Sequence, residues 1–184
     1  MKTWTEFYKQ RLNDSYYNHV KTKYKRFIDE ISVSYSAGYR VVELGCGMAN
    51  ITRALIDNNL WAEYSIMDLE QGMLDLSESN LRNNQKYVTI SKGDILLDCL
   101  SGDVAHSHGV LEHFCDSQIR KIIALQKDNY SKLIHYVPSN KYETPSFGDE
   151  RLLSVDQWKE ICNPDEIIEF NDGYDLILKW KGNK

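Results

Sequence analysis

Residues 41–52 constrain the fold of this chain more than any other stretch, because they combine a strand, a tight turn and a helix start. Residues 41–44 form a short, mainly apolar run that is typical of a buried strand. Gly45 and Gly47 have no Cβ atom, so the chain can turn sharply and a ligand can lie against its backbone. The helix that begins near Asn50 directs unpaired N–H groups over this turn, which favours a carboxylate or phosphate there.

Two classes of nucleotide-binding domain use a glycine turn of this kind. The dinucleotide fingerprint G-x-G-x-x-G is matched incompletely, because Asn50 stands in place of its third glycine. The pattern E-x-G-x-G, with an acidic residue at the strand end, is matched in full by residues 43–47. This segment resembles motif I of the class I S-adenosylmethionine-dependent methyltransferases. An ordinary strand-to-helix turn in another α/β domain is the alternative at this point.

The composition is that of a globular protein with 184 residues, 42% of them hydrophobic and 27% charged, and the length predicts one domain. No apolar run is long enough to span a bilayer, and the N-terminus shows no apolar signal core. The four cysteines are widely spaced and form no C-x-x-C pair. We therefore expect reduced thiols and a cytoplasmic location.

The net charge of −5 is unevenly distributed. Residues 1–40 hold eight Lys and Arg against four Asp and Glu, whereas the remaining residues hold 14 against 23. The acidic body argues against extended contact with a nucleic-acid backbone. A basic cluster at residues 21–26 could contact an acidic substrate, but a solvated helix face is the favoured interpretation.

Apolar periodicity predicts strands that alternate with helices along most of the chain. Helices are expected at 4–12 and 15–35, then at 50–59, 70–83, 118–127 and 155–162, and strands at 39–44, 61–67, 86–91, 103–107, 132–137, 166–170 and 174–180. Alternating strands and helices imply a parallel sheet with helices on both faces. Asp172-Gly173 between two apolar runs predicts a C-terminal antiparallel hairpin.

The methyltransferase resemblance covers about residues 38–180 and implies a three-layer α/β, Rossmann-like fold. Its seven strands would lie in the order 3-2-1-4-5-7-6, with the antiparallel hairpin at the end of the chain. We accordingly divide the chain into an N-terminal helical appendage, residues 1–37, and an S-adenosylmethionine-binding core, residues 38–184. Six aromatic residues lie within the first 24 positions. They predict either packing against the core or a lid over the active site.

Acidic and histidine side chains come at the ends of successive predicted strands, at Glu43, Asp68, Asp94 and His108. Ligands of open parallel sheets bind beyond the carboxyl ends of the strands, where the strand order reverses. A carboxylate at Asp68 can accept hydrogen bonds from both hydroxyls of a ribose. NAD enzymes use the same device, and Asp68 could instead cap the helix expected at 70–83.

Two further segments carry the resemblance. Residues 93–95 resemble the adenine-binding motif, and residues 108–114 resemble the segment after the fourth strand that lines the methionine side of the cofactor. The resemblance thus implies a set of cofactor-binding residues: Glu43, Gly45, Cys46, Gly47, Asn50, Asp68, Leu69, Met73, Gly93, Asp94, Ile95 and His108.

The histidines near residue 110 permit one competing interpretation, a metal site formed by His106, His108, Glu112 and His113. Strand alternation sends residues 106 and 108 to the same side, but the sequence supplies no further ligand close by, so we expect no metal. The Asp/Asn/Ser-Pro-Pro-aromatic motif of nucleic-acid amino-methyltransferases is absent, which makes nucleic acid an unlikely substrate.

The sequence therefore predicts a methyltransferase that uses S-adenosylmethionine, releases S-adenosylhomocysteine and acts on a small molecule by in-line transfer. His113 is the first candidate for a general base and Glu112 the second. The alternatives are another S-adenosylmethionine enzyme such as a lyase, a catalytically silent partner subunit and, more weakly, an NAD(P) oxidoreductase. No membrane association is expected.

Overall fold

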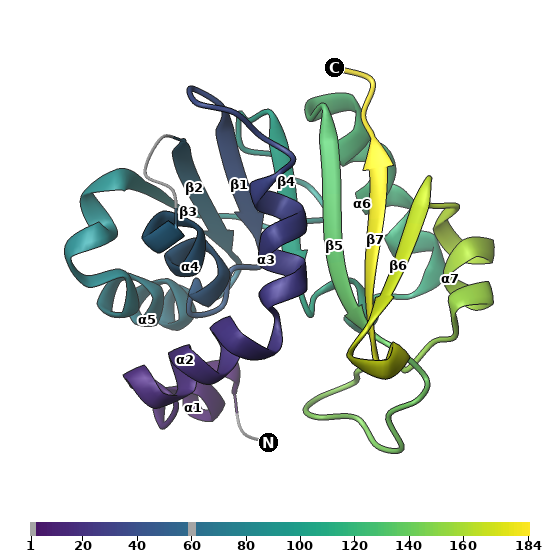
Figure 1. Ribbon diagram of the computed structural model, residues 1–184, viewed down its shortest axis with the longest axis horizontal. Helices are drawn as coiled ribbons and strands as arrows, with labels where there is room; N and C mark the ends of the chain where they lie inside the picture. The colour runs from purple at the N-terminus through teal and green to yellow at the C-terminus, as the bar shows by residue number, and fades with distance from the viewer. Residues whose placement is uncertain (1–2, 59–61) are drawn as a thin grey trace.

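The computed structural model describes residues 3–58 and 62–184, which form a seven-stranded sheet with helices on both faces (Figure 1). The strands are β1 (Arg40–Leu44), β2 (Glu63–Asp68), β3 (Val88–Lys92), β4 (Val104–His108), β5 (Lys132–Pro138), β6 (Glu166–Phe170) and β7 (Asp175–Lys181). Their order in the sheet is β3-β2-β1-β4-β5-β7-β6, which confirms the predicted order.

Seven α-helices and three short 3₁₀ helices connect the strands in the described part of the chain. They are α1 (Trp4–Lys9), α2 (Asp14–Lys23), α3 (Lys25–Ser32), α4 (Asn50–Asn58), α5 (Gln71–Leu81), η1 (Arg82–Tyr87), η2 (Leu111–His113), α6 (Asp116–Asn129), α7 (Val155–Cys162) and η3 (Asn171–Gly173). Within residues 3–58 and 62–184, none of these helices is long and apolar enough to cross a membrane.

Neighbouring residues of each strand point to opposite faces of the sheet and so contribute to two separate cores. Val41 packs in the core beneath α2, α3, α4 and α5, whereas Val42 packs in the core beneath α6 and α7. Figure 1 shows α3 and α4 in front of the sheet and α6 behind it. This arrangement confirms the three-layer architecture.

The site-forming edge follows from the parallel pairing of β1 with both β2 and β4. Glu43 lies opposite Ile66 on one side and His106 on the other, so the three strands end at the same edge. From β1 the chain proceeds to β2 on one side, while β4 lies on the other. The strand order reverses there, which opens a crevice at the carboxyl ends.

The C-terminal hairpin is confirmed. β6 and β7 pair antiparallel, and β7 also pairs antiparallel with β5. Asn171 and Asp172 in the connection have φ values of 49° and 57°, and Gly173 follows with φ 79°. These left-handed residues provide the tight reversal that the Asp-Gly pair predicts.

The single helix expected at 15–35 is wrong, because the structure has α2 and α3 with a break at Tyr24. The Tyr24 ring lies 4.1 Å from the His108 ring and 4.9 Å from the Tyr136 ring, measured between centroids. Tertiary packing of Tyr24 thus accompanies the break, without any glycine or proline. The start of the strand expected at Trp61 lies outside the described residues.

Candidate active site

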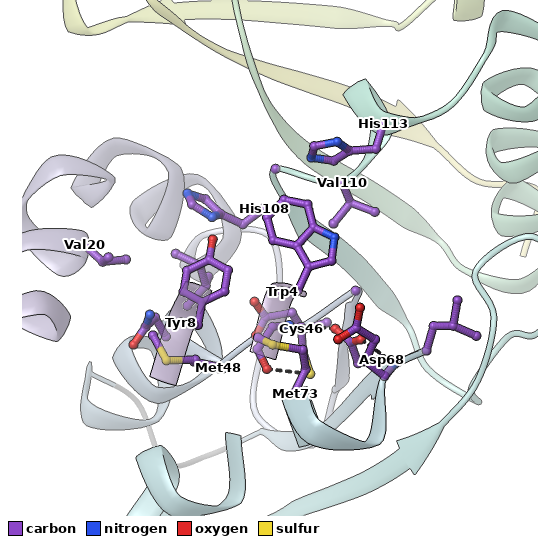
Figure 2. Close-up of a pocket in the computed structure, with 18 of the residues that line it drawn as sticks. Trp4, Tyr8, Val20, Cys46, Met48, Asp68, Met73, His108, Val110 and His113 are labelled. Carbon is purple, nitrogen blue, oxygen red and sulfur yellow. Dashed lines mark hydrogen bonds between the residues drawn. The ribbon is translucent and has the colours of Figure 1, made fainter. Parts of the chain in front are cut away.

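One cavity of about 280 Å³ lies at the carboxyl ends of β1, β2 and β4 (Figure 2). Ten of the predicted site residues line it: Glu43, Gly45, Cys46, Gly47, Asn50, Asp68, Leu69, Met73, His108 and His113. Gly93, Asp94, Ile95 and Glu112 do not line it. The strand-end pattern in the sequence therefore brings most of its members to one place.

The glycine turn after β1 has a backbone that only small residues can follow. Gly45 has φ 65°, and a Cβ atom there would lie 2.8 Å from a methyl group of Val110. Gly47 has φ 53°, and a Cβ atom there would meet only the Met73 methyl, at 3.5 Å. Ala49 also has a positive φ, 54°, although it is fully buried. A side chain at position 45 would thus clash with Val110, whereas the space beside Gly47 is open toward the cavity.

Glu43 fixes the end of β1 to the first turn of α4. Its carboxylate accepts hydrogen bonds from the Thr52 backbone N–H, at 3.1 Å, and from the Thr52 hydroxyl, at 2.6 Å. Burial raises the pKa of Glu43 to about 7, although the Thr52 hydrogen bonds act in the opposite direction. Glu43 therefore supports the turn through its hydrogen bonds to α4.

Asp68 connects the glycine turn to the segment that leads into α5. One carboxylate oxygen accepts from the Gly47 N–H at 2.9 Å, and the other accepts from the Glu70 N–H at 3.0 Å. Burial raises the pKa of Asp68, while these backbone hydrogen bonds counteract the increase. Helix α5 begins at Gln71 with Glu70 as its N-cap residue, so the expectation that Asp68 itself caps the helix is wrong.

Residues 93–95 form a turn after β3 at the margin of the site. The Asp94 carboxylate accepts from the Leu96 N–H at 2.9 Å, and the Asp94 N–H donates to Asp98. The Gly93 N–H donates to the Asp68 carbonyl at 3.1 Å. The turn is therefore joined to the end of β2 through the backbone.

His108 ends β4 with its imidazole packed among aromatic rings. It stacks on Tyr136 with centroids 4.5 Å apart, and Tyr24 and Phe27 lie against it. Burial and the positive charge of Lys23 lower the pKa of His108 to about 3, so the ring is neutral. Its Nε2 atom has no hydrogen-bond partner among the described residues, although His108 lines the cavity.

Glu112 and His113 lie next to each other but in different environments. Glu112 is 1% exposed, and burial raises the pKa of its carboxyl well above the usual range. His113 lines the cavity, and its Nδ1 atom lies 3.0 Å from a carboxylate oxygen of Asp149. If Nδ1 carries the proton that Asp149 accepts, Nε2 is the basic nitrogen of the ring. His113 is therefore the better placed of the two candidate bases.

The N-terminal helices supply one wall of the cavity. Trp4 and Tyr8 of α1 and Tyr16 of α2 line it, whereas Tyr17 points elsewhere and donates to Asp57 at 2.5 Å. The Thr5 hydroxyl donates to the Glu70 carboxylate at 3.1 Å, which joins α1 to the start of α5. Three of the six N-terminal aromatics that the sequence analysis singled out thus reach the cavity.

Several lining residues were not identified from the sequence: Val20, Met48, Ile51 and Glu70. Gly109, Val110 and Phe114 also line the cavity and were expected there only as members of the segment 108–114. Most of them adjoin predicted site residues, so their position beside the motifs was the available signal. Val20 reaches the cavity through the packing of α2, which no local pattern specifies. Among the described residues, no group of three His, Cys, Asp or Glu side chains is arranged to bind a metal.

Comparison with known proteins gives one family match. A family model described as a methyltransferase domain matches residues 42–125. This range includes the glycine turn, Asp68 and the segment at 108–114. Among curated proteins, none has a sequence that matches this chain.

Three solved structures are representative of those with a similar fold. PhzM, a pyocyanin biosynthetic protein, has a TM-score of 0.72 and 15% identity, covering 89% of this chain and 56% of its own. Magnesium protoporphyrin IX methyltransferase from Synechocystis, with bound S-adenosylhomocysteine, has a TM-score of 0.66 and 14% identity, covering 87% of this chain and 84% of its own. An S-adenosylmethionine-dependent methyltransferase from Clostridium acetobutylicum has a TM-score of 0.69 and 14% identity, covering 89% of this chain and 92% of its own.

The chain spans only 50% to 62% of the length of PhzM and four other similar structures. At such low identity the likenesses show the fold, and the family model adds the match over residues 42–125. By its strand order the chain has the fold of the class I S-adenosylmethionine-dependent methyltransferases, and its residues 42–125 match the methyltransferase-domain family model.

Proposed function

We propose that this chain is an S-adenosylmethionine-dependent methyltransferase that acts on a small-molecule acceptor. The observation that carries the proposal is the shared cavity at the reversal of strand order. Its lining includes the glycine turn and the Asp68 carboxylate, which together we call the floor, and also Trp4, Tyr8 and His113. One cavity thus offers groups for a nucleoside and, beside them, groups for a second molecule.

The residues on the floor fit S-adenosylmethionine. Asp68 would accept hydrogen bonds from the ribose hydroxyls, and the Cβ-free position at Gly47 leaves room for the ligand against the backbone. Leu69 and Met73 would contact the adenine, with residues 93–95 at its margin. The unpartnered Nε2 atom of His108 offers a polar contact to the methionine portion.

When bound, the cofactor supplies a methyl group on a positively charged sulfur, so much of the protein's task is to orient the acceptor. His113 would accept a proton from the nucleophile at Nε2, while Asp149 holds the ring through Nδ1. Glu112 stays the second candidate base. Its burial and raised pKa favour the protonated form at neutral pH, and this form cannot accept a proton.

We also propose that α1, the first helix of the N-terminal appendage at residues 1–37, forms a lid over the cavity, while α2 and α3 pack on the core. Helix α1 has no buried residue and contacts two different segments beside the cavity. Its Thr5 hydroxyl donates to Glu70, and its Trp4 ring lies against His113. The rings of Trp4 and His113 lie 5.2 Å apart, so this contact joins the lid to the segment after β4. Closure by the lid would exclude water and hold the acceptor.

A methyl-transfer assay tests the proposal. The protein is incubated with S-adenosylmethionine labelled at the methyl group and a panel of small-molecule acceptors, and products are identified by mass spectrometry. Labelled product together with S-adenosylhomocysteine is the expected result. Cleavage of the cofactor without labelled product would instead indicate a lyase, and binding without any turnover would indicate a silent subunit.

A further inference from the structure

Aromatic rings form a continuous part of the cavity lining. Trp4, Tyr8 and Tyr16 come from the N-terminal helices, and His113 and Phe114 come from the segment after β4. Figure 2 shows the Trp4 ring between Tyr8 and His113, with Cys46 and Met73 below it in this view. We call these five residues the aromatic wall.

The Trp4 ring is held in place by other rings. Phe147 lies edge-on to it with centroids 4.6 Å apart, and Phe147 in turn stacks on Phe7 at 4.3 Å. Tyr8 lies nearly parallel to Trp4, with an interplanar angle of 17°. These contacts fix Trp4 as part of an ordered surface, which favours flat ligands over flexible aliphatic ones.

The charges around the cavity argue against an anionic acceptor. None of the described residues that line it is Lys or Arg, so a carboxylate or phosphate on the acceptor would be desolvated without a partner. Asp68 accepts from backbone N–H groups and Glu70 from the Thr5 hydroxyl. None of these neutral donors cancels the charge of a carboxylate, so both side chains further disfavour an anion.

We infer that the acceptor is a planar aromatic compound with a hydroxyl group and no anionic group, and that Trp4 is its main specificity-determining residue. The inference rests on the proposed methyltransferase function. The acceptor ring packs on the aromatic wall and presents its hydroxyl to His113. The oxygen loses its proton to His113 and bonds to the methyl carbon as the bond from that carbon to the cofactor's sulfur breaks.

Calorimetry on protein saturated with S-adenosylhomocysteine tests the charge preference. Two probes share one ring system: 2-naphthol is neutral and 2-naphthoate is anionic. We expect 2-naphthol to bind at least about tenfold more tightly than 2-naphthoate, a ratio well within the resolution of the method. Equal or tighter binding of 2-naphthoate would overturn the inference.

Substitutions at Trp4 test its role. Trp4→Leu keeps apolar bulk but removes the ring, and it should weaken 2-naphthol about tenfold, while Trp4→Phe should weaken it less. Tyr87→Ala, at an exposed aromatic residue of η1 that does not line the cavity, is the matched control and should bind like the unmodified protein. Unchanged 2-naphthol affinity in folded Trp4→Leu and Trp4→Ala proteins would contradict the assignment.

Binding of S-adenosylhomocysteine separates this inference from the function on which it rests. Trp4 variants should keep the S-adenosylhomocysteine affinity within about twofold, because Trp4 is not among the residues proposed to bind the cofactor. If S-adenosylhomocysteine binds and 2-naphthol does not, the aromatic-acceptor inference fails while the methyltransferase proposal stands. If S-adenosylhomocysteine does not bind to the unmodified protein, both fail.

Discussion

At the scale of single residues, His113 has the geometry of a general base, because Asp149 contacts one ring nitrogen and the ring lines the cavity. His113→Asn should therefore lower kcat by about 10²–10⁴-fold, the usual contribution of such a group, and leave S-adenosylhomocysteine binding unchanged. The Asp149 side chain is 82% exposed, so Asp149→Asn should have a much smaller effect. Steady-state kinetics with parallel calorimetry checks both. Full activity in His113→Asn would remove its role as a base.

Glu43 makes a specific prediction for the pH dependence of stability. Its pKa is about 7 in the folded protein against 4.5 ordinarily, so the folded state keeps the proton over a range where the unfolded state has lost it. Stability should fall as pH rises from about 4.5 to 7, by up to ~3 kcal/mol from this group, and then level off.

Glu43→Gln isolates this contribution, because glutamine can still accept from Thr52 but does not titrate. Urea unfolding at pH 5 and pH 8 should show that the unmodified protein loses more stability over this interval than the variant does. An identical loss in both proteins would mean that Glu43 does not titrate in this range.

Ala49 has a left-handed backbone, with φ 54°, in a turn where glycine would be unstrained. Ala49→Gly should raise the free energy of unfolding by about 1 kcal/mol, since an L-residue pays roughly that amount for this conformation. Ala54→Gly is the matched control, because Ala54 is equally buried but lies within α4, where glycine destabilises by a similar amount. Thermal unfolding that lowered both midpoints equally would contradict the strain at Ala49.

At the scale of elements, the proposed lid depends on the contact between α1 and α5. A Cβ atom at Gly72 would lie 2.4 Å from the Thr5 hydroxyl and 2.8 Å from its methyl group. Gly72→Ala should therefore displace α1 and reduce methyl transfer, although alanine favours helix formation in α5.

The double variant Thr5→Ala/Gly72→Ala removes the clashing atoms and should recover part of the activity. Deleting residues 1–12 should likewise cost methyl transfer more than cofactor binding. The measurement compares methyl-transfer rates and S-adenosylhomocysteine affinities of these three variants with those of the unmodified protein. Full activity in Gly72→Ala would show that the close contact between α1 and residue 72 is not required for methyl transfer.

At the scale of the whole molecule, the strands could be predicted because each carries its own apolar run, and their order followed from the methyltransferase resemblance. The break at Tyr24 could not be predicted, because the contact that accompanies it joins that ring to His108 and Tyr136, far along the chain. The pairs Trp4–Phe147 and His113–Asp149 could not be predicted either, because each joins residues that lie far apart in the sequence. Motif spacing thus predicted the cavity-lining residues at the ends of β1, β2 and β4, whereas the lining residues from α1 and α2 depend on contacts between distant segments.

The central claim is that the groups at the ends of β1 and β2 bind S-adenosylmethionine. Calorimetric titration of the unmodified protein and of Asp68→Asn with S-adenosylhomocysteine and with NAD tests it most directly. We expect S-adenosylhomocysteine to bind and NAD not to bind. In Asp68→Asn the loss of a charged acceptor should cost about 1.5–3 kcal/mol of S-adenosylhomocysteine binding. Tighter binding of NAD, or unchanged S-adenosylhomocysteine affinity in a folded Asp68→Asn protein, would contradict the account.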